Sequence, residues 1–219
     1  EVLATHLLEV IMRSFGRLFT LRALRRLLDE MVNVSDRTRA EANRRLIEEL
    51  IPEKVPVDLL LSVFRLLLEE RVSIRNLPLI LESVAESRSL GNPEAICEHV
   101  RQRMGFQLVA ESRRADGTLP LIQLAPDWES VFTTYQVAGD RGQTDVALPP
   151  EVFNRLAAQV SEKVARAAET GVFPAIITSA RRRRFLRAVL AAKGVMAPVL
   201  SFEEIGFDAR PALVGMVPA

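Results

Sequence analysis

The feature that most constrains the fold is a change of hydrophobic periodicity near residue 112. Before it, apolar residues recur at intervals of three and four, as at Leu60, Phe64 and Leu67, which is typical of amphipathic helices. After it, short apolar runs at 119–125, 173–180 and 198–202 alternate with helix-like segments. We therefore predict an α plus α/β protein: a helix within 1–19, an all-helical part over 20–111, and a small α/β part over 112–219 with a Rossmann-like layout.

Capping residues predict where the individual helices begin. Thr20, the pair Ser35-Asp36, Asn76 and Asn92 each precede a helix-like stretch, and Pro56 opens another. The last helix of the first part is expected to run over 93–111. In the second part we predict helices over 127–136 and 149–170, a loop over 138–145, and a further helix after residue 179.

The bulk composition describes an ordinary globular chain. It is 48% hydrophobic, its 29 Lys and Arg nearly balance its 28 Asp and Glu, and neither half is a basic module. No apolar run reaches the roughly 20 residues that span a bilayer. The single cysteine, Cys97, excludes an internal disulfide and fits a reducing compartment. Because the chain opens on Glu1 within an uncapped helical pattern, we expect a fragment of a longer protein, whose membrane segments could lie upstream.

The residue patterns of common catalytic sites are missing from the sequence. No clustered glycines follow a strand, so the α/β part lacks a nucleotide loop, which disfavours a nucleotide-dependent enzyme. His6 and His99 lack metal-ligand spacing, and Ser179 has no nucleophile-elbow glycines, so we interpret it as a helix N-cap. We expect no enzyme activity, metal or cofactor.

Four consecutive arginines, Arg181 to Arg184, open the helix after residue 179. Arg182 falls in line with the apolar face of that helix, so its stem should pack on the domain body. Arg181, Arg183 and Arg184 are expected to face an acidic partner, with solvated or structural roles as the plain alternative. A nucleic-acid-binding module is a further alternative, which the neutral chain and the wrapping of the charges around the helix disfavour.

Several longer segments resemble a known family. These are "LLLEERVSIRNLPLILESVAE" at 66–86, "TSARRRRFLRAVL" at 178–190 and "PVLSFEEI" at 198–205. In this order they resemble the C-terminal cytoplasmic region of the export-gate family of type III secretion, which serves flagella and virulence injectisomes. The resemblance implies the last helix of a truncated first subdomain, an all-helical third and an α/β fourth. It also implies a nonameric ring at the cytoplasmic face of the bacterial inner membrane, which receives export substrates and their chaperones beside a separate ATPase complex.

The resemblance also implies roles for individual residues. Thr5 matches a position at the border of the chaperone cleft. Arg75 and Glu82 match a segment that contributes to ring contacts, and we expect them to make a contact between subunits or between subdomains. A local contact that supports the helix cap is the alternative for Arg75. The linker after Tyr135 lacks the glycine-rich form of several flagellar members. The flagellar and virulence branches therefore both stay open, with the flagellar one favoured.

Overall fold

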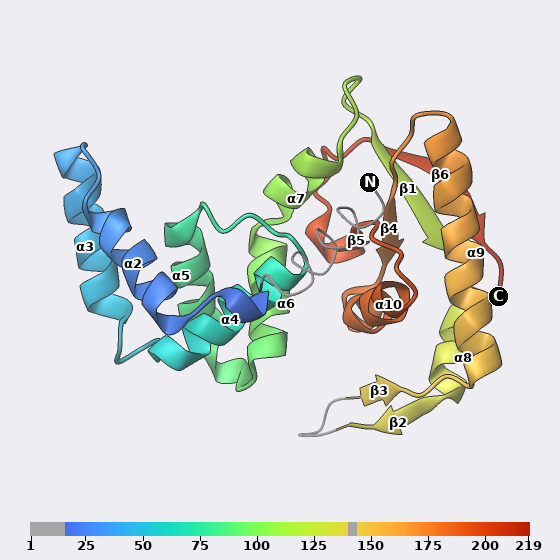
Figure 1. Ribbon diagram of the computed structural model, residues 1–219, viewed down its shortest axis with the longest axis horizontal. Helices are drawn as coiled ribbons and strands as arrows, with labels where there is room; N and C mark the ends of the chain where they lie inside the picture. Colours follow the sequence, from blue (N-terminus) through green and yellow to red (C-terminus); the bar gives the residue numbers. More distant parts are fainter. Residues whose placement is uncertain (1–15, 140–143) are drawn as a thin grey trace. The chain divides into compact units, whose positions relative to one another are not determined.

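A computed structural model describes residues 16–139 and 144–219, which fall into two compact units that divide between Met104 and Gly105. Figure 1 shows helices alone in the first unit and a sheet with its helices in the second. The α plus α/β class predicted from the periodicity is therefore confirmed. Thr5 and the helix predicted within residues 1–15 lie outside the described residues.

The first unit consists of short amphipathic helices. Three of the predicted caps are made by side chains: Thr20 Oγ1 accepts from the Ala23 N–H, Asp36 Oδ1 from Thr38, and Asn92 Oδ1 from Ala95. Asn76 also occupies an N-cap position, although its side chain makes no capping bond. The helices are α2 (Leu21–Val32), α3 (Arg37–Leu50), α4 (Val57–Glu69), α5 (Leu77–Ser87) and α6 (Pro93–Arg103), with a 3-10 turn η1 (Arg88–Leu90) after α5.

The core of the first unit follows the predicted stripe of α4. Leu60, Phe64 and Leu67 are fully buried there, together with Ile80 of α5 and Ile96 of α6. One buried ion pair crosses this unit: Arg101 Nη1 of α6 lies 3.3 Å from Glu70 Oε2, directly after α4. This pair connects the end of α4, just before the segment 72–76, to α6.

The second unit begins with α7 (Gly105–Ser112). The single helix predicted over 93–111 is therefore two helices, α6 and α7. The chain then alternates between strands and helices. These are β1 (Leu119–Leu124), α8 (Asp127–Thr134), β2 (Gln136–Ala138), β3 (Thr144–Val146), α9 (Pro150–Glu169), β4 (Ala175–Thr178), α10 (Ala180–Ala192), β5 (Val199–Ser201), the 3-10 turn η3 (Phe202–Glu204) and β6 (Pro211–Val217).

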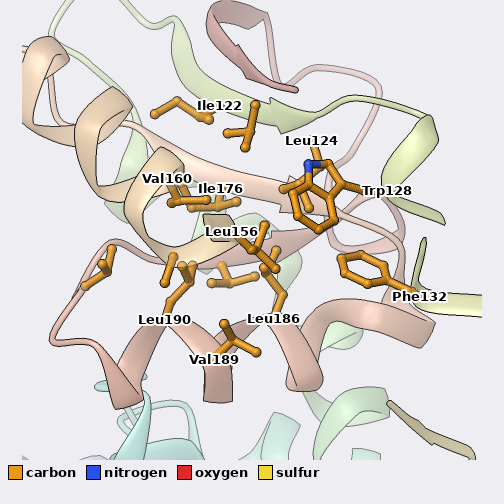
Figure 2. Close-up of a cluster of buried hydrophobic side chains, with 14 residues drawn as sticks. Ile122, Leu124, Trp128, Phe132, Leu156, Val160, Ile176, Leu186, Val189 and Leu190 are labelled. Atoms are coloured by element: carbon orange, nitrogen blue, oxygen red, sulfur yellow. The ribbon is translucent and has the colours of Figure 1, made fainter. Parts of the chain in front are cut away.

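The main sheet of the second unit is parallel, with the order β5-β4-β1-β6. Strands β2 and β3 form a separate antiparallel pair, where the sequence had predicted the end of a helix and a loop. Figure 2 shows the core that α9 and α10 close against the sheet, with Ile122 and Ile176 from the strands and Leu156 and Leu186 from the helices. Trp128 of α8 completes this cluster and donates from Nε1 to the Pro218 carbonyl at 2.8 Å.

Candidate functional site

The arginine helix α10 starts at the edge of the sheet where the parallel strands end. Ser179 occupies the N-cap position, as predicted, but its side chain accepts no hydrogen bond from the first turn. The Ala180 N–H instead donates to the Glu203 carboxylate of η3 at 3.0 Å. A carboxylate from another element therefore balances the positive end of the helix dipole, although arginines fill the first turn.

Arg182 is buried, and its guanidinium binds Glu129 of α8. The Arg182 Nε atom lies 3.0 and 3.1 Å from the two Glu129 oxygens, and Nη2 lies 2.6 Å from Oε1. The guanidinium also lies over the ring of Phe132 and reaches Gln136 Oε1 at 3.3 Å. The expected packing of the Arg182 stem is thus accompanied by an ion pair, whose carboxylate partner is 52% exposed.

Arg183 corrects one expectation from the sequence. It was expected to face an acidic partner, but its side chain is 0% exposed and lies against Glu204, which is also 0% exposed, with Arg183 Nε 3.8 Å from Glu204 Oε1. Glu204 in turn accepts from the Ser201 N–H at 2.9 Å in a capping box. A carboxylate within the same unit therefore takes the role that the sequence had assigned to an external partner.

The remaining two arginines of the run stay accessible. Arg181 is exposed and its Nη2 donates to Gln136 Oε1 at the start of β2. Arg184 is half-buried, and among the described residues no hydrogen bond or ion pair engages its side chain. Only Arg181 and Arg184 could therefore meet an acidic partner. A nucleic-acid helix would need its charges at the surface, so the burial of Arg182 and Arg183 removes half of the basis for that alternative.

Sequence reasoning missed the acidic residues that bind these arginines and the first N–H of their helix. Glu129 follows β1, Glu203 and Glu204 follow β5, and the arginines follow β4. Because neighbouring parallel strands end at the same edge of a sheet, the strand order would have brought these residues together. The charged residues that follow the strands could have been recognised in the sequence. Their proximity could be predicted only from the strand order β5-β4-β1, which the hydrophobic periodicity does not reveal.

In the first unit, the segment 72–76 presents Arg75 at the surface. Val72 is buried and anchors the segment, whereas the side chains of Arg75 and Glu82 are exposed. No ion pair or hydrogen bond with another described residue engages either side chain. Within the part of the chain that the structure describes, Arg75 therefore has no cap-supporting contact.

Residues 16–139 and 144–219 contain neither a metal-binding cluster nor a membrane-spanning helix. No group of His, Cys, Asp and Glu side chains in these ranges is close enough to share a metal ion. No helix in them has both the length and the apolar content to cross a bilayer. Arg182 and Arg183 pair with carboxylates of their own unit, whereas the side chains of Arg75, Glu82 and Arg184 have no such partner among the described residues.

Comparison with known proteins decides the family. The model of the FHIPEP family matches residues 1–210 of this chain. The chain belongs to the FHIPEP family. It is 34% identical over 217 residues to the flagellar biosynthesis protein FlhA of Caulobacter vibrioides, covering 99% of this chain and 30% of that protein. It is 30% identical over 172 residues to protein hrpC2 of Xanthomonas euvesicatoria, covering 76% of this chain and 26% of that protein.

Solved structures share the fold of this FHIPEP chain. The Chlamydia pneumoniae CdsV protein superposes with a TM-score of 0.80 at 20% identity, over 99% of this chain and 60% of that one. The nonameric EPEC SctV-C superposes with a TM-score of 0.79 at 19% identity, over 96% of this chain and 61% of that one. The resemblance to the export-gate family of type III secretion is therefore confirmed. The chain spans about a third of the length of its FlhA relative.

Proposed function

We propose that this chain is the cytosolic end of a flagellar-type protein export gate, which assembles into a ring and docks export substrates with their chaperones. The observation that carries the proposal is the family match over residues 1–210, together with a fold shared with SctV-C, a protein solved as a nonamer. The 34% identity to the FlhA of Caulobacter vibrioides, over 99% of this chain, supports the flagellar branch. The ring would stand at the cytoplasmic face of the inner membrane, beside the export ATPase complex. A structure of CdsV has been solved with CdsO, which supports a further apparatus partner.

Arg75 and Glu82 are the residues that we propose for contacts in the ring. Both are exposed, both carry a charge, and no described residue of their own unit engages their side chains. Arg75 presents a planar guanidinium that can bind a carboxylate of a neighbouring subunit through two hydrogen bonds. The buried Val72 and the Glu70–Arg101 pair hold the segment that carries Arg75, so the side chain projects from a fixed backbone.

Ring assembly is tested on a chain extended upstream to the length of the relatives' cytosolic region. Light scattering and negative-stain electron microscopy should show oligomers for the native sequence, and Arg75→Glu should shift the oligomers toward monomers. Arg39→Glu, an equal charge change at an exposed position of α3, is the matched control and should leave assembly unchanged. A strict monomer at every concentration would contradict the ring. Equal loss of assembly in both variants would contradict the role of Arg75.

Docking is tested separately with the same extended chain immobilised on a biosensor. Complexes of the host's flagellar export chaperones with their substrates should bind, while chaperones from an unrelated secretion pathway should not. If no flagellar chaperone complex binds to a chain that forms rings, the docking half of the proposal is wrong and the assembly half stands.

A further inference from the structure

A groove lies at the edge of the sheet where the parallel strands begin, opposite the edge where the arginine helix starts. Pro174 immediately precedes β4 and Pro198 immediately precedes β5, and because these strands are parallel neighbours, their first residues meet at one edge. The end of α7, the segment 113–115 and Val164 of α9 complete the walls. The resulting hollow has a volume of about 780 Å³, within the range of protein binding sites, and all of its lining residues belong to the second unit.

The wall of the groove is apolar and open. Phe173 is 75% exposed, although a buried phenylalanine would contribute about 1.5–3 kcal/mol to stability. It stands in the turn before β4, beside Val164, Met196 and Ala197, which are only partly buried. An exposed apolar patch with a polar rim is typical of a surface that another molecule covers.

The rim of the groove carries two arginines, Arg113 and Arg114, and one acid, Glu111. The side chain of Arg114 is exposed, and no hydrogen bond or ion pair with a described residue engages it. Arg113 Nη2 donates to the Asp208 carbonyl at 2.9 Å and lies 3.6 Å from a carboxylate oxygen of the same residue. Because the Asp208 side chain is 88% exposed, the ion pair itself is weak. The Arg113 Nε atom is buried and has no acceptor among the described residues. The acid of the rim, Glu111, already accepts a hydrogen bond from Gln107 at 3.2 Å.

We propose that this groove docks an amphipathic helix of a partner protein, with its apolar residues on Phe173 and a carboxylate of the same helix on Arg113 and Arg114. The apolar wall favours apolar residues and the arginine rim favours a carboxylate. A cationic segment would therefore not suit the rim, and a purely polar one would not suit the wall. Helix-in-groove recognition uses apolar anchors one turn apart, and an acidic residue beside them would reach the rim. The proposal depends only on the second unit and stands independently of ring assembly and of chaperone docking.

The test uses three synthetic amphipathic peptides of about 15 residues, long enough for helix formation. They are identical except for one central residue next to the apolar stripe, which is Glu, Gln or Lys. Binding to the full 219-residue chain is measured by fluorescence anisotropy at low salt, and the side-chain N–H resonances of the arginines are followed by NMR. We expect the Glu peptide to bind about tenfold more tightly than the Gln peptide, as one charge-assisted hydrogen bond would produce, and the Lys peptide to bind least.

Variants assign the binding to the groove. Phe173→Ser and Arg114→Glu should each weaken binding of the Glu peptide at least about tenfold. Arg39→Glu makes the same charge change at an exposed position of the first unit and should leave the affinity unchanged. Binding of the Glu peptide should also move the Nε–H resonance of Arg113. Because Phe173 and Arg114 are exposed, their variants should unfold at the same urea concentration as the native chain, which separates lost binding from lost folding.

Three outcomes would overturn the proposal. Equal affinity for the Glu, Gln and Lys peptides would reduce the groove to a nonspecific apolar surface. No binding of any peptide up to millimolar concentration would leave the exposed Phe173 without the proposed role. A concentration-dependent dimer of the native chain that Arg114→Glu abolishes would assign the groove to a second copy of this chain.

Discussion

The buried ion pair between Arg183 and Glu204 makes a quantitative prediction when it is compared with the neighbouring pair of Arg182 and Glu129. Both arginines are buried and both bind a carboxylate, but Glu204 is 0% exposed whereas Glu129 is 52% exposed. Replacement of either arginine by methionine keeps most of the apolar stem. The two variants therefore differ mainly in what happens to the carboxylate left behind.

In Arg183→Met, the Glu204 carboxylate would stay buried and would keep its hydrogen bond from the Ser201 N–H. Breaking a buried pair by removal of one partner costs about 3–5 kcal/mol, because the other charge loses its compensation inside the protein. In Arg182→Met, Glu129 can be hydrated in place, and the cost should be about 1–2 kcal/mol, as for the loss of a partly exposed charged hydrogen bond. We therefore expect the first variant to be less stable than the second by about 2 kcal/mol.

The assay follows urea unfolding by tryptophan fluorescence. Trp128 is the single tryptophan of the chain and lies in the core of the second unit, so its signal reports on that unit. The double variant Arg183→Met with Glu204→Gln should recover part of the lost stability, since it removes the buried charge together with its partner. If Arg183→Met is as stable as Arg182→Met, or if the double variant recovers nothing, the burial of Glu204 does not control the energetics of this edge and the reasoning is refuted.

Two further changes test other contacts of the second unit. Gly105→Ala would place a Cβ 2.1 Å from the Glu204 carbonyl oxygen, so α7 and η3 would have to separate. We expect the free energy of unfolding to fall by about 1–3 kcal/mol in the same urea titration. Native stability in this variant would contradict the prediction. The pKa of Asp116 is lowered from its ordinary value of 3.8, first by the Thr118 hydroxyl and then by the Thr118 N–H. A lowered pKa means that the carboxylate stabilises the fold above 3.8 and loses this contribution as the pH falls through the folded-state pKa. Asp116→Asn should therefore be less stable than the native chain at neutral pH and should approach it at strongly acidic pH, whereas a stability difference that does not change with pH would contradict the assignment.

The sequence predicted those elements whose signals are local. Thr20, Asp36 and Asn92 cap helices as expected, because a capping side chain and its N–H partner lie within three residues of each other. The helix expected over 93–111 is interrupted after Arg103, where Gly105 packs against the Glu204 backbone from the far end of the unit. The hydrophobic periodicity of residues 93–111 cannot reveal a contact with a residue as distant in the sequence as Glu204.

The same distinction explains the outcome at the candidate sites. The apolar alignment of Arg182 along its helix was local, and its burial was predicted, whereas the burial of Arg183 follows from Glu204, which lies beyond β5. The pair β2–β3 was missed because its strands have three residues each and border a glycine-containing stretch, which favours a loop over a strand. Arg75 and Glu82 were singled out through the family resemblance, and their roles in the ring stay predictions.

The strand order of the second unit also bears on the time course of folding. In the first unit, consecutive helices such as α5 and α6 pack on each other, so much of it can form from contacts between neighbours in sequence. In the second unit, β1 comes first and lies between β4 and β6, and Trp128 beside it bonds to Pro218 across 90 positions. Contacts between distant segments slow folding, because the loop between them must close before they contribute stability. The helical unit should therefore become protected from hydrogen exchange first, while β1 keeps an open edge until β6 arrives.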